Sequence, residues 1–202
     1  MNAAALLDLM RSRRSIRRYT AQPVSQEILA ELLEAARWAP SAHNRQPWRF
    51  AVLVDPQHRR ALAEAMGERF RRDLVADGLP LAEVERQVSR SVARIAGAPA
   101  VVVVFLSMAD MDRVADVSRQ ALERTMAVQS VALAVQNMLL LAHAHGLGAC
   151  WMCAPLFCPD VVRAVLDLPA DWEAQALVTL GYPAEERTKG RDLLAGKVRW
   201  YG

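Results

Sequence analysis

The feature that most constrains the fold is an unbroken apolar run, Ala100 to Leu106, which contains four consecutive valines. Valine is β-branched and favours strands over helices. A strand that is apolar on both faces must be buried on both faces. We therefore expect this run to be the central strand of a sheet that helices cover on either side.

The apolar spacing in the rest of the chain predicts more helix than strand. We expect helices over 3–11, 25–38, 58–96 with a break at 77–80, 113–145 and 159–166, and further strands over 48–54, 149–152 and 173–180. The longest helix has almost no polar face near its middle, which predicts burial on all sides, with a partner subunit as the natural cover. The fold class that follows is α+β, in a single domain over residues 1–202.

Composition limits the classes of function. The chain has 202 residues, 53% hydrophobic, with a net charge of +3, so it can bury a core without disulfides. Three cysteines and no recognisable secretory signal lead us to expect a cytoplasmic protein. Gln136 and Asn137 interrupt the longest apolar run, so no membrane span is expected. The weak basic excess argues against nucleic acid as a partner.

Two polar clusters flank the helix expected over 25–38. The first is Arg13 to Tyr19, Arg-Arg-Ser-Ile-Arg-Arg-Tyr, whose compact guanidinium groups suit a discrete anion such as phosphate. The alternative is a solvated basic helix end. The second is Ala39 to Phe50, Ala-Pro-Ser-Ala-His-Asn-Arg-Gln-Pro-Trp-Arg-Phe, whose alternative is an ordinary loop before a strand. We interpret the intervening helix as a spacer between parts of a site.

These two clusters share their order and spacing with a known family once three later segments are added. Those segments are Gly146 to Trp151 (Gly-Leu-Gly-Ala-Cys-Trp), Gly181-Tyr182-Pro183 and Lys189-Gly190-Arg191. Together they resemble the flavin-dependent nitroreductases, which carry FMN at a homodimer interface. The resemblance implies a three-layer nitroreductase-like fold, with a central mixed β-sheet covered by helices on both faces. It also implies an intertwined homodimer whose C-terminal tail wraps the partner.

The resemblance further implies which residues bind the cofactor. They are Arg13, Arg14, Ser15, Arg17, Pro40, Ser41, Ala42, Asn44, Trp151, Met152, Cys153, Ala154, Lys189 and Arg191. By this resemblance the first four contact the phosphate and flavin of their own subunit, and the next four reach the flavin of the partner. Residues Trp151 to Ala154 pack beside the ring system, where a backbone N–H points at the hydride-accepting nitrogen. Lys189 and Arg191 bind phosphate. No catalytic acid, nucleophile or metal ion is expected, because the flavin carries the redox chemistry.

The sequence departs from the family pattern at two places. Ala42 stands where many members have a second serine, and Cys153-Ala154 stands where many have Glu-Gly. The second departure indicates a different subgroup. The segment 146–185 is also similar to the nitroreductase-like domain of deazaflavin-coenzyme biosynthesis proteins.

The function implied is an FMN-dependent oxidoreductase that passes hydride or electrons from NADH or NADPH to a nitroaromatic, quinone or dehydro-precursor acceptor. The alternatives are a non-catalytic flavin- or ligand-binding homologue and a reductase of a deazaflavin-coenzyme precursor. A family branch that fragments flavin with oxygen to make the lower ligand of cobalamin is a further alternative, which no residue of this chain favours.

Several polar residues have a less specific interpretation. Cys150 and Cys153 form a Cys-x-x-Cys near His143 and His145, which could indicate a zinc or dithiol site. A strand over 149–153 would direct the two thiols to opposite faces, so buried, inert cysteines are expected instead. His43 is expected to be a surface residue.

Overall fold

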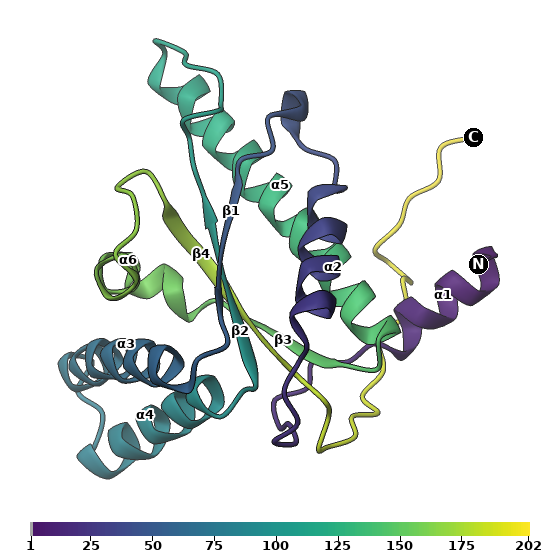
Figure 1. Cartoon of the computed structure of the whole chain (residues 1–202). Coiled ribbons are helices and arrows are strands. Elements are labelled where there is room, and N and C mark those ends of the chain that lie inside the picture. The colour runs from purple at the N-terminus through teal and green to yellow at the C-terminus, as the bar shows by residue number, and fades with distance from the viewer. Residues whose placement is uncertain (1) are drawn as a thin grey trace.

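The protein, described by a computed structural model over residues 2–202, contains six α-helices, two short 3₁₀ helices and four strands within that range (Figure 1). In chain order these are α1 (Ala3–Ser12), α2 (Gln26–Arg37), η1 (Ala42–Asn44), β1 (Trp48–Leu53), α3 (Pro56–Ala76), α4 (Leu81–Ala96), β2 (Ala100–Leu106), α5 (Val117–Ala144), β3 (Gly148–Met152), η2 (Ala154–Phe157), α6 (Pro159–Leu166) and β4 (Glu173–Gly181). The predicted helices and strands are confirmed to within a few residues. The two 3₁₀ helices were not predicted.

The strands form one sheet in the order β1-β2-β4-β3, and every neighbouring pair is antiparallel. β2 is buried along its whole length, which confirms the prediction that it is a central strand. The mixed character expected of the sheet is limited, among the described residues, to one parallel bridge between Ser15 and Ala149 at the β3 edge. The α+β class is confirmed.

Helices cover both faces of the sheet, as the valine run requires (Figure 1). Val102 and Val104 face a core shared with α2 and α5, whereas Val101 and Val103 face a second core shared with α3, α4 and α6. The alternation follows from the two-residue period of a strand. The result is three layers, helix on sheet on helix.

The longest helix, α5, is the one described helix that is long and apolar enough, by length and composition, to cross a membrane. Its buried residues, including Val131, Val135 and Met138, pack on the sheet, which is the arrangement of a core helix. Its other face is open in the single chain, where Leu122 is 62% and Leu133 46% exposed. One chain alone therefore does not bury α5 on all sides, and its cover by a partner subunit stays a prediction.

The spacer helix α2 begins as predicted. The Ser25 hydroxyl accepts a hydrogen bond from the Ile28 N–H at 3.3 Å and so caps the helix. Its apolar face, through Leu29, Leu32 and Ala36, packs on α5 and the sheet. This packing fixes the positions of the two polar clusters at its ends.

Candidate functional site

The first polar cluster lies along the free edge of β3. The Ile16 N–H donates to the Ala149 carbonyl at 3.0 Å, and Ser15 bridges to the same residue. This approach requires glycine at position 148, because a Cβ there would lie 2.7 Å from Ile16 Cγ2. The Gly-Leu-Gly motif thus brings the segments 13–17 and 146–151 together, as their shared resemblance predicts.

Tyr19 fastens the end of this cluster to the sheet. Its hydroxyl donates to the Ile16 carbonyl at 2.6 Å and lies 2.7 Å from the Thr179 hydroxyl on β4. Burial raises the pKa of Tyr19 well above its usual range. The Arg17 N–H donates to Glu185 Oε1 at 2.7 Å, which ties the same segment to the start of the tail. Tyr19 therefore has a structural role.

Four arginines line an open pocket of about 400 Å³, and one of them, Arg11, belongs to α1. Arg13 and Arg14 follow α1, and Arg191 comes from the C-terminal tail. Burial and the charges of Arg191 and Arg14 lower the pKa of Arg13, so these guanidinium groups repel one another. Arg14 Nε is buried and has no hydrogen-bond partner among residues 2–202. Unpaired positive charge around a cavity is the electrostatic environment that an anion requires.

His143 borders this cluster and was missed by the sequence analysis as a neighbour of the site. Its Nε2 lies 2.8 Å from the Ser12 hydroxyl. Burial and the charges of Arg13 and Arg14 lower the pKa of His143, which favours the neutral imidazole. A signal was available, because His143 lies five residues before Gly148 of the glycine motif.

The second cluster forms a tight loop around η1. The Ala42 N–H donates to the Ser130 hydroxyl on α5 at 3.1 Å, and the Gln46 N–H donates to the Ser41 hydroxyl at 3.1 Å. His43, Asn44 and Gln46 all have positive φ, between 50° and 55°. Left-handed backbone at three non-glycine residues is unusual and is typical of functional loops. Gln46 stabilises the loop through its backbone N–H.

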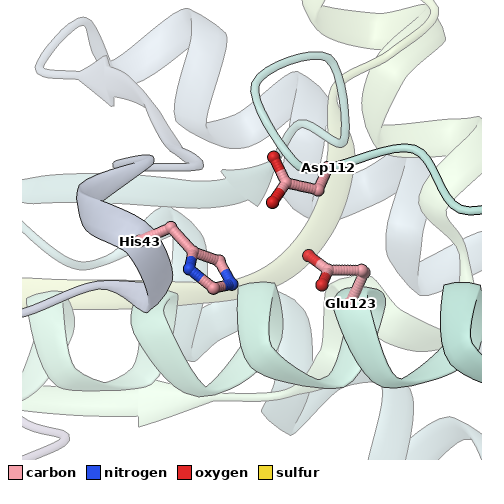
Figure 2. A group of neighbouring side chains, drawn as sticks. All are labelled: His43, Asp112 and Glu123. Atoms are coloured by element: carbon pink, nitrogen blue, oxygen red, sulfur yellow. The ribbon is translucent and has the colours of Figure 1, made fainter.

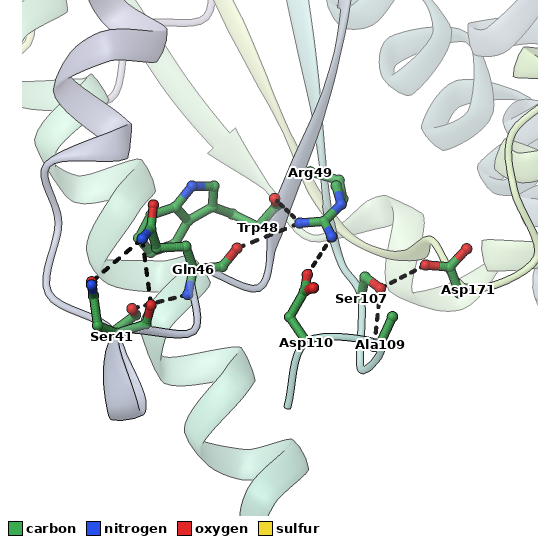
Figure 3. Close-up of polar contacts among 9 residues, drawn as sticks. Ser41, Gln46, Trp48, Arg49, Ser107, Ala109, Asp110 and Asp171 are labelled. Carbon is green, nitrogen blue, oxygen red and sulfur yellow. Dashed lines mark hydrogen bonds and ion pairs between the residues drawn. The ribbon is translucent and has the colours of Figure 1, made fainter. Parts of the chain in front are cut away.

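A polar network anchors this loop to the adjoining strands (Figure 3). Arg49 on β1 donates to the carbonyls of Gln46 and Trp48, at 3.4 and 2.9 Å, and pairs with Asp110 beyond β2. Ser107 donates to Asp171 at 2.6 Å at the same end of the sheet. The loop is therefore held rigidly relative to β1 and β2.

The two clusters lie at opposite ends of α2 (Figure 1). A helix of 12 residues is about 18 Å long. The arginine pocket and the loop 40–46 consequently do not line one common cavity within a single chain. Lys189 is exposed beside the pocket-lining pair Gly190 and Arg191.

The segment after Cys150 ends β3. Trp151, Met152 and Ala154 are half-buried, whereas Cys153 is exposed and accepts a hydrogen bond from the Trp151 indole N–H at 2.9 Å. Cys150 is buried and burial raises the pKa of its thiol. The expectation of two buried cysteines is correct for Cys150 and wrong for Cys153, because the chain leaves the strand at Met152 and turns into η2.

A cavity larger than the arginine pocket lies elsewhere and was not predicted. About 880 Å³ in volume, it lies where β2 ends and β4 begins, and is lined by residues that include Met108, Arg113, Arg163, Asp171 and Trp172. None of the predicted cofactor residues lines it. Its residues come from four separate segments, a juxtaposition that no local sequence pattern reveals.

Comparison with known proteins shows which family the chain belongs to. The model of the nitroreductase family matches residues 10–182, which is most of the chain. The chain belongs to the nitroreductase family. The match spans both polar clusters and the Gly146 to Trp151 segment and ends at Tyr182, so Lys189-Gly190-Arg191 lies outside it.

Individual nitroreductase relatives extend over nearly the same length. A Thermus thermophilus protein named NADH dehydrogenase is 38% identical over 199 residues, covering 86% of this chain and 84% of the relative. A 5,6-dimethylbenzimidazole synthase from Rhodospirillum rubrum is 34% identical, covering 88% of this chain and 82% of its own. Among solved structures, a nitroreductase-like protein from Desulfovibrio desulfuricans in complex with FMN is 30% identical, with a TM-score of 0.75, covering 100% of this chain and 98% of that one.

The arginine pocket of this nitroreductase fits a flavin mononucleotide at its phosphate end. A phosphate carries negative charge and several acceptor oxygens. The negative charge would relieve the mutual repulsion of Arg13, Arg14 and Arg191. The acceptor oxygens are the kind of partner that the buried Arg14 Nε lacks among the described residues. The donor set is thus suited to the phosphate group.

Proposed function

We propose that this nitroreductase is an FMN-dependent oxidoreductase that transfers reducing equivalents from NADH or NADPH to a small conjugated or aromatic acceptor. The observation that carries the proposal is the pocket lined by Arg11, Arg13, Arg14 and Arg191, together with the buried Arg14 Nε, which has no hydrogen-bond partner among the described residues. Bound FMN would supply the redox chemistry, taking hydride from the nicotinamide and passing it to the acceptor. The protein would act as a single domain in the cytoplasm.

The side chains around the pocket would bind and orient the cofactor. Arg13, Arg14 and Arg191 would hold the phosphate by charge-assisted hydrogen bonds, with Lys189 adding positive charge nearby. Ser15 and Arg17 lie on the segment that pairs with the β3 edge and would contact the flavin. A positive charge near the pyrimidine end of the ring would stabilise negative charge that develops there on reduction.

The end of β3 would form one wall of the ring site. Trp151 and Met152 are half-buried apolar side chains that can pack against a flat ring and exclude water from it. Cys153 and Ala154 would present backbone at the ring edge. This role depends on backbone position, so the departure from Glu-Gly is compatible with it.

The loop carrying Pro40, Ser41, Ala42 and Asn44 would complete the site of a partner subunit. It is held rigidly by Ser130 and Arg49, yet none of its residues lines the arginine pocket of its own chain. A homodimer that pairs each loop with the other chain's pocket accounts for both facts. The exposed face of α5 and the apolar tail would be buried in that dimer.

The visible spectrum of the purified protein tests the proposal. We expect a yellow protein with the absorbance of bound FMN, bleached by NADH or NADPH without oxygen and restored by a quinone or a nitroaromatic compound. A protein that stays colourless after FMN is added and the excess removed contradicts flavin binding. A yellow protein that no nicotinamide bleaches supports the non-catalytic flavin-binding alternative.

The Rhodospirillum rubrum relative favours a second candidate function, the oxygen-dependent fragmentation of reduced FMN to 5,6-dimethylbenzimidazole. The two candidates differ in what becomes of the flavin. Aerobic incubation with FMN and excess NADPH, followed by chromatography, should leave the FMN intact under the first proposal. Stoichiometric loss of FMN with appearance of the benzimidazole supports the second. Reduction of a deazaflavin-coenzyme precursor stays a prediction. The assay in which an acceptor restores the bleached flavin absorbance can test it, with that precursor as the acceptor.

A further inference from the structure

Three side chains from separate segments converge near the loop 40–46, outside the residues assigned to the flavin (Figure 2). His43 lies on η1, Asp112 lies on the connection between β2 and α5, and Glu123 lies on α5. One potential ligand atom from each lies within 4.8 Å of the other two. The three side chains point toward one another in Figure 2.

Glu123 is the residue whose environment points most directly to a bound ligand. It is only 9% exposed, and its Oε2 atom is buried without any hydrogen-bond partner among the described residues. Burying a carboxylate without a partner is costly, and buried charges in proteins are normally paired or coordinate a metal ion. A buried carboxylate that has an unpartnered oxygen and lies beside an imidazole and a second carboxylate is therefore a candidate cation ligand.

The three segments are held in register by contacts that do not use the three side chains. Ser130, which receives the Ala42 N–H, lies two helical turns after Glu123 on the same buried face of α5. Gln120 accepts from the Val114 N–H at 2.8 Å and so fastens the connection after Asp112 to the same helix. The convergence is built into the fold.

The chemistry of this set suits a transition-metal ion. One imidazole and two carboxylates are common ligands of Zn²⁺ and neighbouring divalent ions. Asp112 also pairs with Arg45 through Oδ1, which leaves Oδ2 available. Bonds of about 2.1 Å place tetrahedral ligand atoms roughly 3.4 Å apart. Rotation of the exposed His43 side chain can shorten its present separation from the carboxylates.

We propose that His43, Asp112 and Glu123 bind one divalent transition-metal ion of the Zn²⁺ class, with water completing the coordination. The two carboxylates neutralise the ion, and the ion supplies the partner that Glu123 Oε2 lacks. Its effect is structural: it cross-links η1 and the β2–α5 connection to α5. The left-handed backbone at His43, φ 50°, is then the conformation that directs the imidazole toward α5.

Zinc titration of the full-length, EDTA-treated protein by calorimetry tests the site directly. We expect one Zn²⁺ per chain, and a melting temperature that rises with Zn²⁺ because the ion binds the folded state. His43→Ala and Glu123→Gln should each weaken Zn²⁺ binding by at least about tenfold and abolish the rise. His43 is exposed, so its variant should fold even if Glu123→Gln does not.

Matched controls separate this site from adventitious binding. His58→Ala and Glu64→Gln remove an exposed histidine and an exposed glutamate from α3 and should leave Zn²⁺ binding unchanged. Cys153→Ser should also leave it unchanged. Zinc affinity that is lost in Cys153→Ser, or that is unaffected in both His43→Ala and Glu123→Gln, overturns the proposal, as does absence of binding to the wild type. None of these readouts depends on FMN.

Discussion

At the scale of single residues, the arginine pocket is an electrostatically unfavourable arrangement that an anion would relieve. Arg13, Arg14 and Arg191 repel one another, and Arg14 Nε has no hydrogen-bond partner in the part of the chain that the structure describes. Burial and the charges of Arg13 and Arg14 lower the pKa of the nearby His143. Such a cluster is more informative about binding than about stability, since like charges weaken the fold unless something neutralises them.

Arg191→Ala should therefore weaken FMN binding selectively. A charge-assisted hydrogen bond contributes about 1.5–3 kcal/mol, so the dissociation constant for FMN should rise roughly 10- to 150-fold. Riboflavin lacks the phosphate, and its affinity should not change. Quenching of flavin fluorescence on titration with the protein measures both constants.

The control for this substitution is Arg72→Ala, which removes an exposed arginine from α3. It should bind FMN as the wild type does. Equal losses of affinity for FMN and riboflavin in Arg191→Ala would place Arg191 away from the phosphate. That result would contradict the assignment of the pocket to the phosphate group.

At the scale of elements, α2 is the component that sets the geometry of both polar clusters. One end leads back to the arginine segment and the other leads into the loop around η1. Its amphipathic pattern and its serine cap were visible in the sequence, because both depend on residues within one helical turn of each other. The direction in which each cluster faces was not visible.

What escaped the sequence analysis depends on contacts between distant segments. The positive φ values at His43, Asn44 and Gln46 occur at residues other than glycine, so no local rule marks them. The exposure of Cys153 depends on where β3 ends, and the convergence of Asp112 and Glu123 on His43 depends on tertiary packing. By contrast, the valine run of β2 specified its own burial, because a strand without a polar face has no alternative in water.

Ser25→Ala should destabilise the protein by removing the cap of α2. Loss of an N-cap hydrogen bond costs about 1 kcal/mol, which lowers the melting temperature by about 2–4 °C for a chain of this size. Ser25→Asp retains an acceptor for the Ile28 N–H and should melt close to the wild type. Thermal unfolding followed by circular dichroism compares the three proteins, and equal melting temperatures for the alanine and aspartate variants would mean that the cap contributes nothing.

At the scale of the whole molecule, a single chain leaves apolar surface on several elements that flank the site. Leu122 and Leu133 on α5 are exposed, and Trp200 and Tyr201 in the tail are about nine-tenths exposed, at 92% and 90%. Large aromatic side chains in such positions are typical of protein interfaces. In the proposed homodimer, a second copy of the chain would cover these side chains and its loop 40–46 would complete the arginine pocket.

Heterodimers of two defective chains test this shared site. In a dimer of Arg13→Ala with Asn44→Ala, one site receives both lesions and the other receives neither if each flavin is bound between subunits. We expect the heterodimer, isolated through a different affinity tag on each chain, to regain about half of the wild-type nicotinamide oxidation and flavin content. Each variant homodimer should have little of either.

The reciprocal dimer makes the test decisive. When one chain carries both Arg13→Ala and Asn44→Ala and the other is wild type, a shared arrangement puts one lesion in each site, so neither site is intact. If both clusters served the flavin of their own chain, the wild-type chain would keep a complete site and half of the activity would survive. The two arrangements therefore predict opposite results from the same pair of substitutions, and a difference in stability between variants cannot produce that reversal because both dimers carry the same two lesions.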